Sequence, residues 1–154
     1  MYETKYHKAG SVADAVAALA GAEEGKVLSG GQTLLPTMKQ HLAAPTDLVD
    51  VRGIDGMQGV TVGDGTITIG AATTHADVAD SAEVRQHIPG LAALAGGIGD
   101  PAVRAMGTIG GSIANNDPAA DYPSAVLGLG ATVITDKREI AADDFFDGMF
   151  ATAL

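Results

Sequence analysis

Two glycine-rich stretches contain the residues whose types and spacing favour ligand binding. In the first, "VLSGGQTLLP" (27–36), a short apolar run leads through Gly30 and Gly31 to Thr33 and a periodic apolar segment. A strand that passes through glycines into a helix points free backbone N–H groups and the positive end of a helix dipole at one place, which suits a phosphate. Glycine allows close approach, and Thr33 can cap the helix or donate to an oxygen. A tight turn without a ligand is the alternative.

The second stretch, "GTIGGSIANNDPAAD" (107–121), is expected to be neither a regular helix nor a regular strand. If Pro118 begins a short helical turn, Asp117 caps it. Asp121 then lies one turn further on and can accept hydrogen bonds from sugar hydroxyls. Neither stretch matches the Rossmann or P-loop fingerprint. A glycine-rich crossover with surface acids is the alternative interpretation.

The composition limits the classes of partner. The chain has 154 residues, 46% hydrophobic and 18% charged, which is enough for one ordinary folded domain with a core. A net charge of −10 argues against nucleic acid and anionic membrane surfaces. An acidic protein can still bind a phosphate through backbone N–H groups. No apolar stretch is long enough for a transmembrane segment, and the absence of cysteine fits a cytoplasmic protein.

Other catalytic arrangements are weak. His7 and His41 are expected at the surface, and neither His75 nor His87 has a carboxylate at the spacing of a zinc site. No serine lies in a nucleophile elbow, and no nucleophile–base pair is visible. If the protein takes part in redox chemistry, a cofactor must supply that chemistry.

The order of elements predicts an α+β fold with two subdomains that meet near residues 52–58. Ser11 is expected to cap a helix over 12–20. After it we expect strands at 26–29 and 47–51, with a helix from about residue 33 to 42 between them. Then follow a hairpin within 60–73, a helix over 74–88, a small-residue helix closed by Gly96 and Gly97, a helix over 123–129 and a strand over 131–135.

Three segments together resemble a known family: "LSGGQTLLPTMKQHLAAPTDLVDV", "ITIGAATTHADV" and "IGDPAVRAMGTIGGSIANNDPAADYPSAVLGLGA". They are similar to the FAD-binding medium subunit of molybdenum hydroxylases, most closely that of aerobic carbon monoxide dehydrogenase, and to the flavin domain of xanthine dehydrogenase. The combination of a GGQ[ST] loop, a TIGG loop and a D-P-x-x-D run is specific, whereas either loop alone is not.

The resemblance implies an FAD-binding domain of the PCMH or vanillyl-alcohol-oxidase-like type, with two α+β subdomains and FAD in the cleft between them. We expect the N-terminal α/β subdomain at residues 1–55 and the second at 56–154. Because family members are roughly twice as long, the second subdomain is expected to be incomplete and the C-terminal domain of the family to be absent.

The resemblance also assigns cofactor-binding residues. The first loop would wrap the FAD diphosphate with Leu28, Ser29, Gly30, Gly31, Gln32, Thr33 and Leu34. The remaining candidates are Thr108, Gly110 and Gly111 for the phosphate and ribityl chain, Asp117 beside them, Asp121 for the adenosine ribose, Ile98 for the adenine and His75 near the isoalloxazine. No catalytic residue and no metal ligand is expected on this chain.

The function implied is that of an oxidoreductase subunit that is active only in a complex. Electrons would leave a molybdenum cofactor on a large subunit, cross [2Fe-2S] clusters on a small subunit, reach this FAD and pass to a quinone or NAD. Two alternatives remain open. One is a flavin-free fragment or paralogue that serves as an assembly module, and the other is a stand-alone FAD-dependent oxidoreductase.

Overall fold

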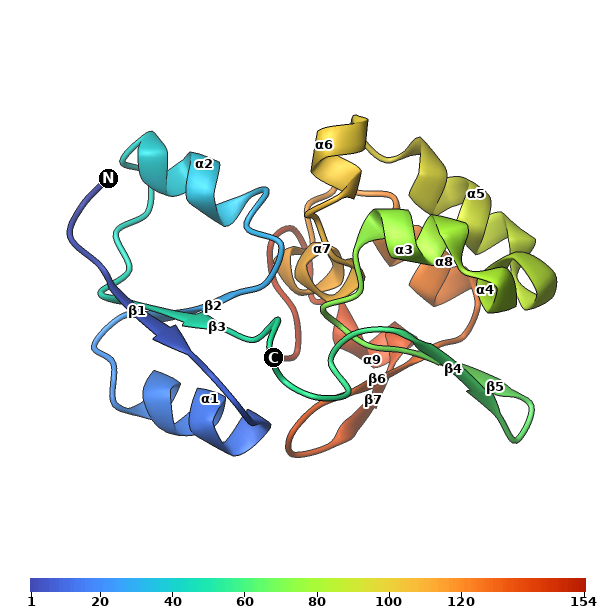
Figure 1. Ribbon diagram of the computed structural model, residues 1–154, viewed down its shortest axis with the longest axis horizontal. Helices are drawn as coiled ribbons and strands as arrows, with labels where there is room; N and C mark the ends of the chain where they lie inside the picture. The colour runs from blue at the N-terminus through green and yellow to red at the C-terminus, as the bar shows by residue number, and fades with distance from the viewer.

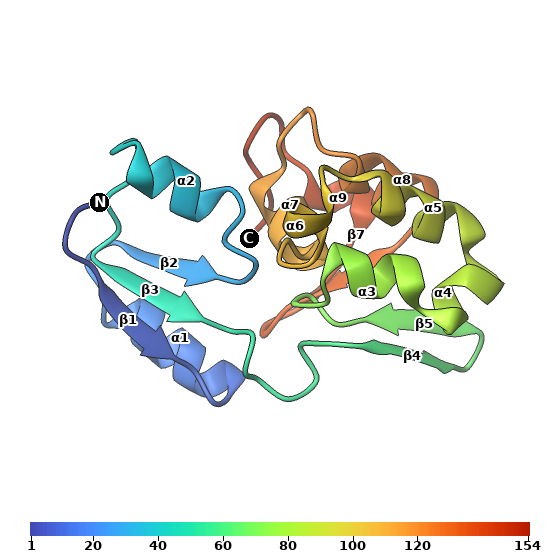
Figure 2. The same cartoon turned by 45° about the horizontal axis from the view of Figure 1, so that its top comes forward.

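The first part of the chain forms a three-stranded parallel sheet between two helices (Figure 1). In spatial order the strands are β1 (Lys5–Lys8), β3 (Asp47–Asp50) and β2 (Gly25–Leu28). Helix α1 (Val12–Ala20) covers one face and α2 (Leu34–Lys39) the other, as Figure 2 also shows. The computed structural model describes residues 1–154.

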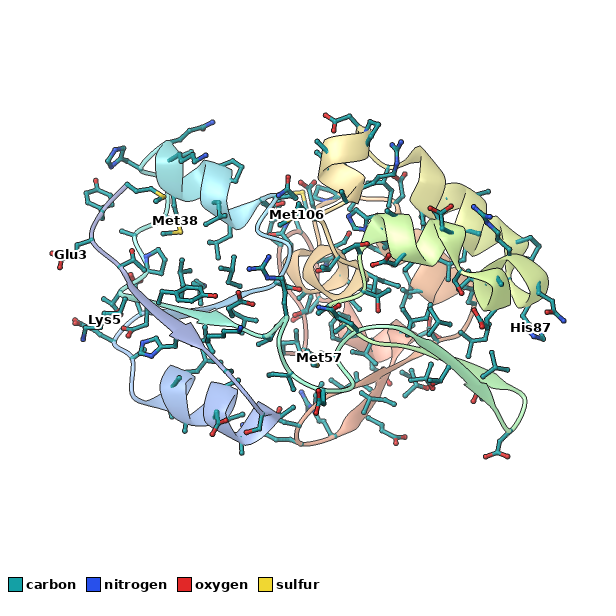
Figure 3. All side chains as sticks on the ribbon, in the orientation of Figure 1. Glu3, Lys5, Met38, Met57, His87 and Met106 are labelled. Atoms are coloured by element: carbon teal, nitrogen blue, oxygen red, sulfur yellow. The ribbon has the colours of Figure 1, made fainter.

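The alternation of side chains along β3 explains why two helices are needed. Val49 packs with Ala15 of α1, whereas its neighbour Leu48 packs with Leu28 and with Met38 of α2. Figure 3 shows Met38 between α2 and the sheet. All residues of β3 are buried, as expected for the central strand of a parallel sheet with both faces covered.

The rest of the chain contains two antiparallel hairpins and a group of short helices. The hairpins pair β4 (Val60–Gly63) with β5 (Thr66–Ile69) and β6 (Thr132–Ile134) with β7 (Glu139–Ala141). The helices are α3 (His75–Asp80), α4 (Ala82–His87), α5 (Pro89–Gly97), α6 (Pro101–Arg104), α7 (Ile109–Asn115), α8 (Tyr122–Gly128) and α9 (Ala142–Phe145). The largest core cluster joins α3, α4, α5, α7 and α8.

Several predicted elements are confirmed, one is corrected and one strand was not predicted. Helix α1 has the predicted bounds, and Ser11 caps it by accepting from the N–H of Asp14 at 3.1 Å. The helix expected over 74–88 is instead two helices, because Ser81 is extended (φ −59°, ψ 126°) and caps α4. Strand β1 was not predicted, since its exposed polar residues at a sheet edge show no apolar pattern.

The second glycine-rich stretch is more regular than predicted. It contains α7, capped by Thr108, and directly before it lies α6, capped by Asp100. Pro118 does not begin a helix, and the next helix, α8, begins at Tyr122. The glycines of α7 therefore lie in a helical turn, where glycine costs about 1 kcal/mol relative to alanine. A specific packing requirement must explain their presence.

Candidate functional site

The loop between β2 and α2 presents a continuous row of free backbone donors. None of the backbone N–H groups from Ser29 to Leu34 donates to a protein acceptor. Gly31 has φ of +70°, a left-handed conformation that other residues rarely adopt, and it turns the chain into α2. Gly30 is buried, and the rest of the row is partly or fully exposed, so its N–H groups can be reached from solvent. Such a row of consecutive free donors is suited to an anion with many acceptor oxygens.

No side chain of this loop accepts a hydrogen bond from the row. Thr33 occupies the N-cap position of α2, but its side chain makes no capping bond, which corrects that alternative of the sequence analysis. Its exposed hydroxyl is free to donate elsewhere, as the other alternative requires. Gln32 is exposed, and its amide donates to the carbonyl of Gly30 at 3.2 Å. Leu28 is buried and holds the loop to the sheet, where its carbonyl accepts from Val51 at 3.1 Å.

The two glycine-rich segments are in direct contact. The Thr108 hydroxyl donates to the Ser29 hydroxyl at 3.0 Å. A Cβ added to Gly30 would lie 2.3 Å from the carbonyl oxygen of Met106 and 2.7 Å from the Cα of Gly107. Figure 3 shows Met106 between the two parts of the chain. Gly30 is therefore required by the close approach of the second segment.

The glycines at the start of α7 serve internal packing in this structure. The N–H of Gly110 donates to the carbonyl of Ala71 at 2.8 Å, and a Cβ on Gly110 would lie 2.5 Å from that same oxygen. The N–H of Gly111 donates to the Thr108 hydroxyl at 3.2 Å. Thr108 is thus at the junction with the first loop, whereas Gly110 packs against Ala71, and the amides of Gly110 and Gly111 are already engaged.

His75 lies behind this junction rather than on its surface. It is the first residue of α3, it is 6% exposed, and its N–H donates to the carbonyl of Gly107 at 2.9 Å. Its ring packs against Gly107 so closely that a Cβ there would be 2.6 Å from Nε2. Burial lowers the pKa of His75. The side chain therefore supports the second segment and offers little surface to a ligand.

The other predicted residues lie along this segment or shortly before it. Ile98 is half-buried and packs against the main core cluster. Asp117 accepts from the N–H of Ala119 at 2.9 Å, which closes a turn instead of capping a helix. Asp121 is exposed at the start of α8, and its carboxylate makes no hydrogen bond within the chain, so it is available to a ligand.

Sequence reasoning missed Asn116, which connects this segment to the end of the chain. It is buried in a left-handed conformation (φ 45°), and its amide donates to the carbonyls of Gly148 at 2.7 Å and Ala151 at 2.9 Å. The two asparagines before Asp117 could have indicated a left-handed residue here, since asparagine tolerates this conformation. Ser112 and Asn115, one turn apart on α7, have side chains without hydrogen bonds inside the chain and are further candidates for ligand contact.

A charged group lies at the same edge of the sheet as the first loop. Asp50, in register with Leu28, receives hydrogen bonds from Arg52 at 2.7 and 3.1 Å and from the Tyr6 hydroxyl at 2.6 Å. Burial raises the pKa of Asp50, but the bonds from Arg52 and Tyr6 outweigh it and lower the pKa to about 2. Arg52 is correspondingly held in place, and its pKa is raised by the same pairing. This group was not predicted.

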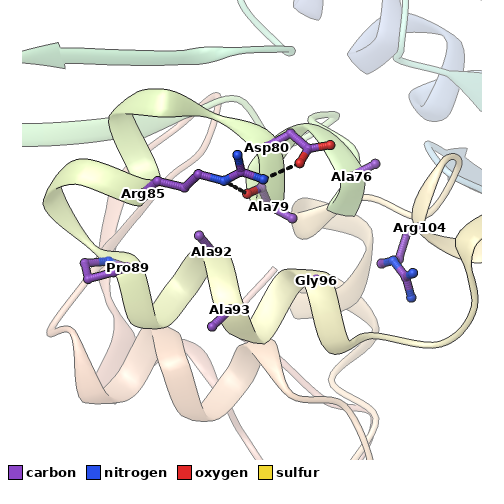
Figure 4. Close-up of a pocket in the computed structure, with 9 residues that line it drawn as sticks. All are labelled: Ala76, Ala79, Asp80, Arg85, Pro89, Ala92, Ala93, Gly96 and Arg104. Atoms are coloured by element: carbon purple, nitrogen blue, oxygen red, sulfur yellow. Dashed lines mark hydrogen bonds and ion pairs between the residues drawn. The ribbon is translucent and has the colours of Figure 1, made fainter.

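A separate groove lies between α3, α4 and α5 and shares no residue with either loop (Figure 4). Its arginines are already engaged. Arg85 pairs with Asp80 and donates to the carbonyl of Ala79, and Arg104 donates to the carbonyls of Ile98 and Gly99. The remaining lining is mostly small and apolar. The groove is therefore not part of the anion site, and the chain contains no cluster of metal-ligating side chains.

Comparison with known proteins agrees with this geometry. Residues 2–154 match the family model described as "FAD binding domain in molybdopterin dehydrogenase". The chain is 36% identical to the nicotine 6-hydroxylase medium subunit of Paenarthrobacter nicotinovorans and 38% identical to the carbon monoxide dehydrogenase medium chain of Hydrogenophaga pseudoflava. Each alignment covers 97% of this chain but 54% of the relative, so the chain spans about half of their length.

The fold comparison leads to the same family. A solved structure of carbon monoxide dehydrogenase from Hydrogenophaga pseudoflava matches with a TM-score of 0.95 and 38% identity, over 99% of this chain and 55% of that one. The predicted resemblance and the α+β fold class are thereby confirmed. No helix is long and apolar enough to cross a membrane. The chain belongs to the family of FAD-binding domains of molybdopterin dehydrogenases.

Proposed function

We propose that this chain holds FAD in a medium subunit of a molybdenum hydroxylase complex similar to carbon monoxide dehydrogenase. The complex would include a large subunit with the molybdenum cofactor and a small subunit with [2Fe-2S] clusters. FAD supplies redox chemistry when bound, and electrons would pass from the clusters through it to a quinone or NAD. The relatives are named for different substrates, nicotine and carbon monoxide, although each is similar to this chain. The choice of substrate would therefore lie in another subunit of such complexes.

The observation that supports this function is the row of free N–H groups from Ser29 to Leu34. A diphosphate offers several acceptor oxygens close together, and consecutive N–H groups can each donate to one of them. The bond between Ser29 and Thr108 fixes the row against the second segment. The residues present therefore fit the diphosphate of FAD.

The remaining contacts with FAD are assigned from the position of each residue and from its polar atoms that have no partner within the chain. The Thr33 hydroxyl and the first-loop amides would donate to phosphate oxygens. The exposed carboxylate of Asp121 would accept from the adenosine ribose hydroxyls. Ile98 would offer an apolar side chain to the adenine. His75 would support the backbone at Gly107 and would not contact the isoalloxazine directly.

Titration of the purified 154-residue chain with FAD, followed by flavin fluorescence, tests this proposal. We expect saturable one-to-one binding, absorbance at about 450 nm, and competition by ADP but not by riboflavin, because the first loop recognises the diphosphate. A chain that binds riboflavin as well as FAD contradicts the role given to this loop. A chain that binds no FAD supports the assembly-module alternative.

The complex is tested by purifying the protein from its native host. Copurification of iron- and molybdenum-containing subunits in fixed stoichiometry supports the subunit assignment. A flavoprotein that purifies alone and reduces an acceptor without them supports the stand-alone oxidoreductase.

A further inference from the structure

Two buried polar atoms have no hydrogen-bond partner, and they belong to neighbouring rings. They are Nδ1 of His75 and the hydroxyl of Tyr122, whose side chains are 6% and 0% exposed. The ring centroids are 5.3 Å apart, with the planes tilted by 41°. Burial lowers the pKa of His75 and raises the pKa of Tyr122, so both rings are uncharged at neutral pH. Buried unpaired polar atoms are rare enough to require an explanation.

This ring pair supports the second glycine-rich segment at both ends. At the start of the segment, the His75 ring lies directly against Gly107, and the His75 N–H holds the Gly107 carbonyl at 2.9 Å. The next residue, Thr108, makes the bond to Ser29 of the first loop. At the other end, Tyr122 directly follows Asp121. Movement of the His75 ring would therefore displace the residue that joins the two loops.

No charged group is positioned to stabilise a protonated His75. On α3 itself, Asp77 is exposed and bonded to Thr74, and Asp80 is paired with Arg85 of α4. Arg104 of α6 donates to main-chain carbonyls, and from α8 the ring meets Tyr122. His75 takes part in no ion pair, and burial alone lowers its pKa. Nδ1 of this ring is buried without a partner, so a proton there would have no acceptor in the folded chain.

We propose that His75 is a positioning residue for the flavin: its uncharged ring, packed between Gly107 and Tyr122, holds Gly107 and Thr108 against the first loop, and protonation of the ring releases them and weakens FAD binding. The inference rests on the proposed function. In the released state the ring is solvated and regains its ordinary pKa of 6.5. The FAD-free chain already buries this ring and lowers its pKa. FAD affinity is therefore constant near neutral pH and falls once the pH is below that lowered pKa, by up to about tenfold per pH unit.

The test is the dissociation constant of FAD, measured by flavin fluorescence between about pH 8 and pH 5. The wild-type chain is compared with His75→Gln, which cannot titrate, and with His87→Gln as the matched control. His87 is exposed on α4 at the far end of the molecule (Figure 3). We expect wild type and His87→Gln to lose affinity at acidic pH. His75→Gln should bind more weakly at pH 8 but show a flat profile. A His75→Gln profile as steep as that of wild type overturns the inference.

A measurement on the wild-type chain guards against misfolding of the variant. The ring signals of the histidines are titrated by NMR with and without FAD, and His75 is assigned with the variant or by its contact to Tyr122. We expect bound FAD to lower the pKa of His75. An unchanged His75 titration overturns the inference and leaves the flavin site standing. Absence of FAD binding at every pH instead overturns the proposed function, and the inference with it.

Discussion

The hydroxyl of Thr108 donates to the hydroxyl of Ser29 at 3.0 Å, and this bond joins two loops that are 79 residues apart in the chain. Thr108 also accepts from the N–H of Gly111, so one side chain both caps α7 and fastens the first loop to it. Ser29 is the first residue of the row of free N–H groups. The position of the row relative to the second segment therefore depends on a pair of small hydroxyl side chains.

Ser29→Ala removes this bond without altering the cap of α7. We expect FAD affinity to fall by about 0.5–1.5 kcal/mol, the usual net contribution of one neutral hydrogen bond. The measurement is the dissociation constant from flavin fluorescence, together with the melting temperature. Thr66→Val is the control, because it removes a comparable hydroxyl bond to Gly63 in a hairpin away from the loops. Equal FAD affinities for wild type and Ser29→Ala would contradict the role of this bond.

Gly30→Ala forces a Cβ against the Met106 carbonyl, 2.3 Å away, where only backbone can yield. Overpacking of this kind costs about 1–3 kcal/mol. We expect both the free energy of unfolding and FAD affinity to fall, because the segments must separate. Gly90→Ala is the matched control, since a Cβ there meets nothing within 4 Å. Urea unfolding of both variants checks this, and equal losses would show that the close contact is not what requires glycine at position 30.

Asp121→Ala should weaken FAD binding by about 1–3 kcal/mol if its carboxylate makes the proposed contact with the adenosine ribose. The melting temperature should not change, because the carboxylate is exposed and makes no bond within the chain. Calorimetric titration with FAD measures the effect, and Asp55→Ala, which removes another exposed acid, serves as control. If affinity is unchanged, Asp121 is a surface acid without a role in binding.

Asp50→Asn should lower the free energy of unfolding by about 1–3 kcal/mol at pH 7, because Arg52 and Tyr6 lose a charged, buried acceptor. The pKa of Asp50 is lowered in the folded state, from 3.8 to about 2. The unfolded chain therefore binds the proton first as the pH falls. The stabilisation is present above pH 3.8 and is lost between that value and about 2. Urea unfolding of both proteins across this range should show their stabilities converging; a constant difference would assign the effect to packing.

Local signals in the sequence were sufficient where a local contact decides the structure. The cap by Ser11 and the apolar stripe after it predicted α1 with its bounds. The run of Gly63, Asp64 and Gly65 predicted the first hairpin, and Asp64 and Gly65 do adopt positive φ. The first loop was predicted as an anion cradle from Gly30, Gly31 and the strand before them, and its N–H groups are free as that prediction requires.

Contacts between distant segments could not be predicted in this way. Gly30 and Gly110 were interpreted as room for a ligand, yet each faces protein backbone, at Met106 and Ala71 respectively. The burial of the His75 side chain also depends on Gly107 and Tyr122, which lie next to it only in the folded chain. Strand β1 carries mostly exposed residues and is held by its pairing with β3. The residue types at positions 5–8 show no pattern that predicts this pairing.

If the peptide N–H groups of the first loop hold the FAD diphosphate, as proposed, the net charge of −10 determines how salt affects binding. Sites built from lysine and arginine lose affinity as ionic strength rises, because mobile ions screen the attraction. Here the fixed dipoles act at contact distance, while the long-range field of the chain repels an incoming diphosphate. Added salt screens the repulsion more than the contact. Association of FAD with this chain should therefore become faster as ionic strength increases, with little change in the rate of release.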